Sequence, residues 1–337
     1  MARHSTIPGM LLAVVGGVLV VGISACSSGE PASTAQTFVR VDGRPSNVIV
    51  GAGSVWVLDR DSGVVSKIDP SSKIVQMSIP TGVQDGTALT LRDNTLWVSG
   101  RTTSATIDIT TDAVAVSAGR AGVSVGDRAF AMGIGSERLV ELDALTGVQR
   151  SVVVLPVLTS TNAQPDVLSS PFATSRGSLY LQYYSEVGPA LGRYDPMSGS
   201  LTFLSSVGAY QSIAVAGSTV WLLDADRSLR GFDATTGKPL AVRAGTRPSL
   251  PPVDPRLAGL DDDQVSLVVA ADGTMWALDQ PAQFLYQLDP ATGQAISSTH
   301  LRYRPSSLLV LDDSVWINNT YDTRITEVDR RHVQLRS

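Results

Sequence analysis

Short apolar runs rich in β-branched and aromatic residues recur along the chain, and polar turn residues separate them. Examples are residues 47–50, 88–91, 213–215, 267–269 and 308–311. Alternating or short continuous apolar runs are typical of half-buried or buried strands. Because no segment sustains the period of an amphipathic helix, the pattern predicts an all-β protein.

An apolar-aromatic pair opens a strand-like run seven times, at intervals of 33 to 55 residues. The pairs are Val55-Trp56, Leu96-Trp97, Ala129-Phe130, Leu179-Tyr180, Val220-Trp221, Met275-Trp276 and Val315-Trp316. A repeat of this length is typical of a four-stranded propeller blade. We therefore expect the aromatic residues to pack between adjacent blades, rather than to form a ring that stacks on sugars.

An aspartate follows each aromatic residue near the end of the third predicted strand: Asp69, Asp108, Asp143, Asp195, Asp233, Asp289 and Asp329. Several are followed by turn residues, as in Asp289-Pro290-Ala291-Thr292-Gly293. Aspartate accepts backbone N–H bonds at the start of a turn, so turn capping is favoured over a calcium array. The two markers predict a seven-bladed β-propeller of four-stranded antiparallel blades over residues 38–337.

Two segments compete to close the ring. Residues 40–46 align with residues 300–306, so Phe38 to Val41 resembles an outer strand arriving from a previous blade. Residues 332–336 also resemble an outer strand. We expect the N-terminal strand to close the ring and the C-terminal one to be displaced or added outside it.

The N-terminus has the pattern of a secretory signal, with an apolar stretch over residues 10–23 that ends at Ile23-Ser24-Ala25-Cys26. These last residues resemble the bacterial lipobox, which implies lipidation of Cys26 and cleavage before it. We expect a signal peptide over residues 1–25 and a lipidated linker over 26–37. The protein would then be lipid-anchored in the cell membrane, on its extracytoplasmic face. The alternative is an uncleaved membrane helix over residues 7–26.

The net charge and the cysteine content exclude several classes of partner and of metal site. The 337-residue chain has a formal net charge of −5, which argues against a nucleic-acid partner. Its single cysteine excludes an intramolecular disulfide framework, a cysteine-based zinc site and an iron–sulfur cluster.

The sequence Arg44-Pro45-Ser46, with the Ser54-Val55-Trp56-Val57 strand and Ile68-Asp69-Pro70, resembles YncE-like and virginiamycin B lyase-like propellers. It is also weakly similar to quinoprotein repeats. The lyase resemblance implies a histidine and a glutamate with magnesium near the central axis. His300 and His332, however, fall on predicted outer strands, so we do not expect that catalytic pair. The docking tryptophan expected of a quinoprotein is replaced by Leu240 and Ala241, and we expect no cofactor.

Candidate binding residues fall in the loops that follow the second strands. Asp59, Asp224 and Asp279 each lie three residues after the aromatic, and Asn319 is equivalent in the last blade. This carboxylate ring could bind a cation or a basic group, although loop capping is the favoured interpretation. Glu186 is a further candidate in one of these loops.

Two insertions, over residues 156–166 and 240–264, connect outer strands to the next blades. The second contains Arg247 and the run Asp261, Asp262 and Asp263. Long ordered loops are often functional, so we include these residues as binding candidates. The three aspartates lack the spacing of an EF-hand loop, and a solvated charge run is favoured over a metal site. We expect deletion of residues 248–264 to leave the fold intact.

These features predict a non-enzymatic, lipid-anchored propeller that binds an envelope protein or polymer. The alternative is a metal-assisted lyase or hydrolase of the virginiamycin B lyase-like type, using carboxylates such as Asp59, Asp224 and Asp279. Binding of single-stranded DNA is disfavoured by the acidic balance.

Overall fold

The computed structural model describes residues 36–86, 88–100, 103–117, 123–125, 128–132, 138–143, 148–154, 172–185, 188–208, 210–224, 226–240, 249–250, 265–319 and 322–333. All of them belong to the unit Thr34–Ser337. The predicted signal peptide lies outside the described residues, as does nearly all of the predicted linker. No helix in the described part of the chain is both long and apolar enough to span a bilayer.

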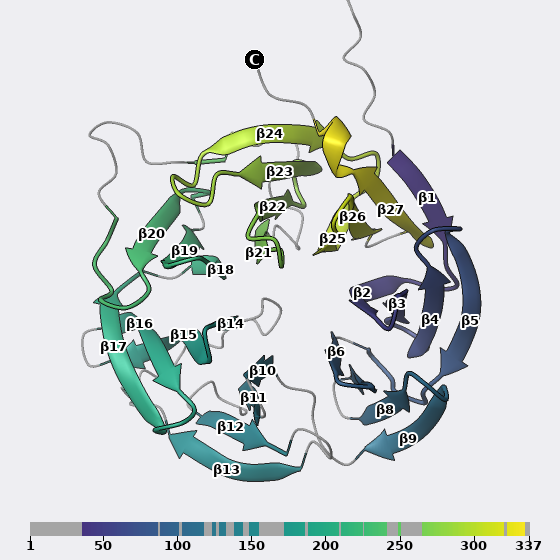
Figure 1. The fold of residues 1–337 in the computed structure, drawn as a ribbon, viewed down its shortest axis with the longest axis horizontal. Coiled ribbons are helices and arrows are strands. Elements are labelled where there is room, and N and C mark those ends of the chain that lie inside the picture. Colours follow the sequence, from purple (N-terminus) through teal and green to yellow (C-terminus); the bar gives the residue numbers. More distant parts are fainter. Residues whose placement is uncertain are drawn as a thin grey trace, which may run out of the picture. The chain divides into compact units, whose positions relative to one another are not determined.

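The described residues form seven antiparallel sheets that follow one another around a ring, with the first strand of each sheet innermost (Figure 1). This confirms the predicted seven-bladed β-propeller. We name the blades A to G in chain order. The loops that join second to third strands, and one blade to the next, make up the loop side. The turns that join first to second and third to fourth strands make up the turn side.

Blades A to C contain twelve strands. They are β2 (Pro45–Gly51), β3 (Ser54–Asp59), β4 (Val64–Asp69) and β5 (Ile74–Pro80) in blade A; β6 (Ala88–Arg92), β7 (Thr95–Ser99), β8 (Ser104–Asp108) and β9 (Ala113–Ser117) in blade B; β10 (Val123–Val125), β11 (Arg128–Met132), β12 (Arg138–Leu142) and β13 (Gln149–Val154) in blade C.

Blades D to G follow the same plan, and blade E has three strands within the described residues. The strands are β14 (Phe172–Ser175), β15 (Ser178–Ser185), β16 (Gly188–Asp195) and β17 (Ser200–Ser206) in blade D; β18 (Tyr210–Ala216), β19 (Thr219–Asp224) and β20 (Leu229–Asp233) in blade E; β21 (Val265–Val269), β22 (Met275–Asp279), β23 (Phe284–Leu288) and β24 (Ala295–His300) in blade F; β25 (Pro305–Val310), β26 (Ser314–Asn319), β27 (Arg324–Asp329) and β1 (Gln36–Arg40) in blade G.

The N-terminal strand closes the ring, as predicted. β1 pairs antiparallel with β27, in a register that runs from Gln36 opposite Val328 to Arg40 opposite Arg324. The predicted C-terminal strand is wrong at its start, because residues 330–332 form the 3-10 helix η1 (Arg330–His332), capped by the side chain of Asp329. Its remainder, residues 334–336, lies outside the described residues.

The seven marker aromatics lie on the second strands and are all buried. Six of them belong to hydrophobic clusters that join two consecutive blades. Trp316 of blade G, for example, packs with Val48 and Val57 of blade A. These aromatics therefore hold the blades together, as predicted.

The turn between the third and fourth strands of one blade reaches back to the aromatic region of the preceding blade. Lys73, in the turn of blade A, lies 5.7 Å from the centroid of the Trp316 ring in blade G. Arg330 of blade G lies 5.5 Å from the Trp276 ring of blade F and bonds Asp272 at 2.7 Å. A cation over an indole face is attracted by the ring quadrupole.

Three other junctions use a neutral hydrogen bond or an ion pair at the same place. Tyr180 Oη donates to the carbonyl of Ala234 at 3.2 Å, and Trp221 Nε1 donates to that of Pro290 at 3.0 Å. Lys67 lies 5.1 Å from the Trp56 ring and bonds Asp112 of the next blade at 3.2 Å. Each of these contacts ties a turn to its neighbouring blade.

The predicted turn caps are present. Six of the seven marker aspartates accept a backbone N–H from two residues further along: Asp69, Asp108, Asp195, Asp233, Asp289 and Asp329. The seventh, Asp143, bonds Arg150, at 3.1 Å to its Nε atom, and the turn that follows it lies outside the described residues. The marker therefore reports turn geometry rather than a metal array.

Candidate functional site

The candidate carboxylates lie at the loop side, where the second strands end beside the starts of the first strands. Asp59 is opposite Pro45, Asp224 opposite Tyr210, and Asp279 opposite Val265. The equivalent Asn319 is opposite Pro305. Each residue thus lies where the repeat predicts. What its side chain can bind depends on the hydrogen-bond and ion-pair partners around it.

Asp59 caps the loop that enters blade A. Its Oδ1 accepts the backbone N–H groups of Arg44 at 2.9 Å and of Asp61 at 3.1 Å, and its Oδ2 accepts from Ser62. Gly43 has φ +81°, and a Cβ there would lie 2.1 Å from Asp59 Oδ2. The loop therefore closes over this carboxylate, as the capping interpretation predicts.

Asp224 and Asp279 are paired with arginines. Arg230 Nε bonds Asp224 Oδ2 at 2.6 Å, and a second guanidinium nitrogen bonds Oδ1. Arg227, from the loop of blade E, reaches Asp279 of blade F, with 3.2 Å between Nη1 and Oδ1. The Asp279 side chain is 0% exposed and that of Arg227 13%. Burial lowers the pKa of Arg227.

Blade G has the uncharged Asn319 at the position that these aspartates occupy in their own blades. Its amide donates to the carbonyl of Arg324 at 2.7 Å and to Thr326 Oγ1 at 3.0 Å. Each of the four equivalent side chains is therefore used within its own loop or blade junction. Among the residues that the structure describes, no group of three His, Cys, Asp or Glu side chains is placed to hold a metal ion.

Several candidate residues and one of the two insertions lie outside the described residues. These are Glu186, Arg247, Asp261, Asp262 and Asp263, together with Cys26 and the insertion over 156–166. Within the second insertion, Ser249 pairs with Ser228, and the backbone N–H of Leu250 donates to the backbone carbonyl of Arg227 at 3.0 Å. This part of the insertion is thus bound to the loop that carries Arg227.

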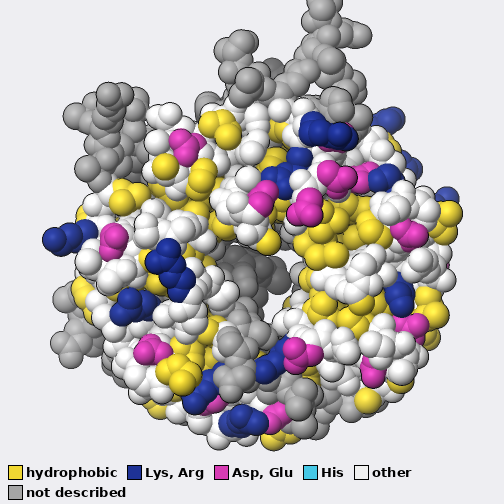
Figure 2. All heavy atoms as spheres, in the orientation of Figure 1, with side chains coloured by type: hydrophobic (Ala, Val, Ile, Leu, Met, Phe, Trp, Pro, Cys, Tyr) yellow, Lys and Arg dark blue, Asp and Glu magenta, His cyan; other side chains and the backbone are white. Residues whose placement is uncertain are grey.

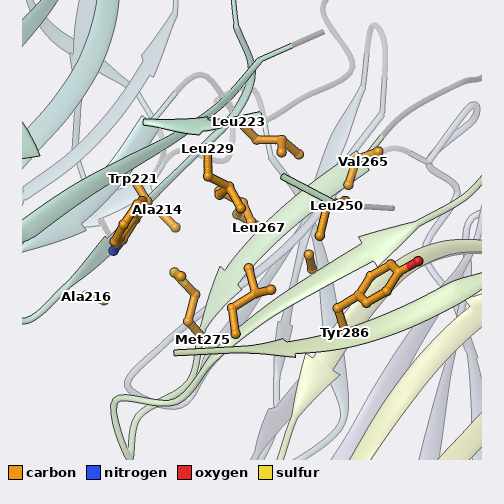
Figure 3. Close-up of a cluster of buried hydrophobic side chains, with 12 residues drawn as sticks. Ala214, Ala216, Trp221, Leu223, Leu229, Leu250, Val265, Leu267, Met275 and Tyr286 are labelled. Carbon is orange, nitrogen blue, oxygen red and sulfur yellow. The ribbon is translucent and has the colours of Figure 1, made fainter. Parts of the chain in front are cut away.

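The position of Leu250 bears on the expectation that deleting residues 248–264 leaves the fold intact. Its side chain is 3% exposed and belongs to the cluster between blades E and F, where Figure 3 shows it beside Val265. Deleting residues 248–264 would remove a core side chain, and such cavities destabilise proteins. The expectation that this deletion spares the fold is therefore wrong at Leu250, and a harmless deletion must keep Ser249 and Leu250.

The two histidines that follow the signal region lie away from the inner strands. His300 ends β24, the outermost strand of blade F, and its ring packs edge-on against Phe284 with centroids 5.1 Å apart. His332 was predicted to lie on an outer strand and instead ends the 3-10 helix η1.

Sequence reasoning overlooked a basic-aromatic cluster at the ring closure, the Tyr303 cluster, formed by Arg40, Arg302, Tyr303 and Arg324. The guanidinium carbons of Arg302 and Arg324 lie 5.7 and 5.0 Å from the centroid of the Tyr303 ring. The signal was present in the alignment of residues 40–46 with 300–306, where Arg302 and Tyr303 stand opposite Asp42 and Gly43.

One face of the ring is hollowed at its centre, and hydrophobic side chains gather beside the hollow near β25, β2 and β6 (Figure 2). Basic and acidic side chains are interspersed over the rest of this face. Such a surface differs from the continuous basic stripe that is typical of nucleic-acid binding.

These observations define the protein as a seven-bladed β-propeller whose blades are joined through aromatic residues and whose loop-side carboxylates are engaged in caps and arginine pairs. No protein-family model matches the chain, and no curated protein matches its sequence.

Solved structures share the fold. Virginiamycin B lyase from Staphylococcus aureus has a TM-score of 0.64 at 14% identity, over 88% of this chain and 99% of that chain. A catalytically inactive His-to-Ala variant of that lyase, with quinupristin, has a TM-score of 0.63 at 14% identity, over 88% and 99%. BamB from Moraxella catarrhalis has a TM-score of 0.56 at 14% identity, over 87% and 98%. At such identities the likeness concerns the fold.

Proposed function

We propose that this protein is a lipid-anchored cell-envelope lipoprotein that acts as a non-enzymatic binding or scaffold propeller for an envelope protein or polymer. The observation that carries the proposal is the state of the loop-side carboxylates. Asp59 is a loop cap, while Asp224 and Asp279 are bonded to arginines. Side chains held in this way support loops and are poorly placed to act as acids, bases or metal ligands.

The anchoring part of the proposal rests on the sequence around Cys26, which resembles a lipobox. Attachment through two or more acyl chains gives stable membrane association. The Cys26→Ser variant is expected to accumulate as an unlipidated precursor that retains its signal peptide. Mass spectrometry of the wild-type protein isolated from membranes provides the measurement, and a mature protein without the added lipid mass would contradict lipidation.

The binding part of the proposal is tested by crosslinking in intact cells followed by mass spectrometry. The test variant replaces residues 253–262 with a short Gly-Ser linker. It keeps Ser249, which pairs with Ser228, and the buried Leu250. We expect it to fold like the wild type and to lose crosslinked partners. The matched control shortens the other insertion, over residues 156–166. Unchanged partners in the first variant would refute the assignment of binding to the longer insertion.

The alternative function is a metal-assisted lyase or hydrolase, and the likeness to virginiamycin B lyase is the observation that favours it. The variant of that lyase described as catalytically inactive lacks one histidine. Here His300 lies on an outermost strand, so its position does not support a corresponding role. Metal analysis of the purified protein decides between the two, because a stoichiometric divalent ion would favour the enzyme.

A further inference from the structure

The Tyr303 cluster brings positive charge together at the seam where β1 closes the ring. Arg40 and Arg302 are exposed, and Arg324 is half-buried. Two of the three guanidinium groups lie over the Tyr303 ring, and the ring of Phe38 packs edge-on against it at 5.2 Å. Tyr303 is thus held from β1 and in turn positions two arginines.

The ladder between β1 and β27 places two of these arginines directly opposite each other. Arg40 is the cross-strand partner of Arg324, and like charges in that position destabilise a sheet. Asp322 offsets part of the charge, with 3.4 Å between its Oδ1 and Arg324 Nε. Asp322 thus bonds one of the three arginines of the cluster. Strand pairing alone does not require such an arrangement.

Blade A provides an internal comparison, because its entry loop has the same framework. Arg44-Pro45-Ser46 and Arg304-Pro305-Ser306 both lead into an inner strand with a register shift just after the proline. Blade A has Asp42 and Gly43 where blade G has Arg302 and Tyr303, and Asp59 where blade G has Asn319. Relative to blade A, the blade G loop therefore has two carboxylates fewer at these positions and has a guanidinium and an aromatic ring in addition.

The positive charge continues from blade G into blade A. The backbone N–H of Val41 donates to the carbonyl of Thr323 at 2.8 Å, which places the blade A loop beside the start of β27. In that loop the exposed Arg60 is held next to Arg44 by a backbone bond of 2.8 Å. Arg44 itself is bonded to Asp61, at 2.7 Å from its Nε and 2.6 Å from its Nη2. Arg60 is therefore the exposed guanidinium that this loop adds, and a spread of arginines over two blades suits an extended anion better than a single small one.

We propose that the Tyr303 cluster binds the phosphate groups of an anionic polymer of the cell envelope. This inference rests on the proposed binding function and names its ligand class. Guanidinium groups match phosphate oxygens with paired N–H donors. Because two guanidiniums lie over the Tyr303 ring, the ring orients cations and is not free to stack on a base. This geometry favours a phosphate backbone over a nucleic acid read through its bases.

Polyphosphate titrated into the full-length protein is the direct test, with affinity measured at several salt concentrations. We expect binding, weakened about 10-fold by Arg302→Ala and by Arg40→Ala, as for loss of one charge-assisted contact. Each variant should also lower the slope of log affinity against log salt by about one. Arg302→Asp, which introduces the residue that blade A has at the equivalent position, should abolish binding.

The melting temperature of Arg40→Ala should stay unchanged or rise, because this variant relieves the repulsion between Arg40 and Arg324.

The matched control is Arg331→Ala, which removes an arginine that is 77% exposed, bonded to Asp329 and located on the turn side. An equal loss of affinity in this variant would overturn the site, because binding would then follow net charge alone. Tighter binding of oligothymidylate or of anionic phospholipid vesicles, with the same arginine dependence, would overturn the polymer assignment. Failure of polyphosphate to bind while cellular crosslinks persist would refute this inference and leave the proposed function standing.

Discussion

The turn side and the loop side of this propeller use aspartate in opposite ways. On the turn side, six marker aspartates make the same contact, accepting a backbone N–H two residues away. On the loop side, equivalent positions have different solutions: Asp59 caps a loop, Asp279 pairs with an arginine of another blade, and Asn319 bonds its own blade. The turn side thus follows a local rule that every blade repeats, while the loop side depends on partners far away in sequence.

The largest effect is expected from breaking a junction on the turn side. Trp276 is fully buried between blades F and G, and Arg330 lies over its ring. Trp276→Ala should lower the free energy of unfolding by about 3–5 kcal/mol, because it leaves a large cavity. Urea unfolding followed by circular dichroism measures the loss. Trp276→Phe, which retains much of the packing, should lose clearly less, and equal losses would show that the cavity is not the cause.

A smaller but still large effect is expected on the loop side at the Arg227–Asp279 pair. Asp279→Ala leaves the guanidinium of Arg227 buried without its carboxylate, which should lower the free energy of unfolding by about 3 kcal/mol. The same unfolding assay checks this value.

The double variant Arg227→Leu with Asp279→Leu sharpens the interpretation of that result. It should recover much of the lost stability, because replacing both partners of a buried pair by apolar residues is often close to neutral. If Asp279→Ala were as stable as the wild type and lost only binding, Asp279 would be a ligand residue rather than a tie between blades.

The smallest effect concerns pH and the turn-side contact that includes Asp272. Hydrogen bonds from Thr274, followed by that from Arg330, lower the pKa of Asp272 from 3.8 to about 2. A carboxylate whose pKa is lower in the folded state stabilises the fold above the unfolded pKa, and this stabilisation is lost as pH falls. The window therefore lies between about pH 4 and pH 2.

The Asp272→Asn variant should accordingly be less stable than the wild type at pH 6, and the difference should shrink as the pH falls through this window. Thermal unfolding at several pH values provides the measurement. A constant difference between the two proteins down to pH 2 would contradict the assigned role of the carboxylate.

Much of the fold was predictable because its markers are local and repeated. Trp56 and Asp69 predict a buried second strand and a capped turn from their immediate neighbours, and the same logic holds in blade after blade. The candidate site was predictable only in position. The sequence places Asp224 and Asp279 at the ends of their second strands, but it does not show that Arg230 and Arg227 reach them.

Ring closure illustrates both what the sequence predicts and what it does not. The alignment of residues 40–46 with 300–306 correctly favours the N-terminal strand, because both segments precede an inner strand. It gives no sign that Arg40 comes to lie opposite Arg324, far along the chain, or that Tyr303 lies beneath two guanidiniums. Likewise, the sequence assigns Leu250 to a loop, and only the structure shows that it is buried between two blades.

The sequence by itself determined the number of blades, their strand order and the turns that join them, since these depend on contacts within a few residues and on a period that repeats. The tertiary structure alone decided which loop-side charges are paired and that Arg40, Arg302 and Arg324 gather around Tyr303. The physical reason is that a charge is stabilised or left in excess by its neighbours in space, and in a closed ring those neighbours come from other blades and from opposite ends of the chain.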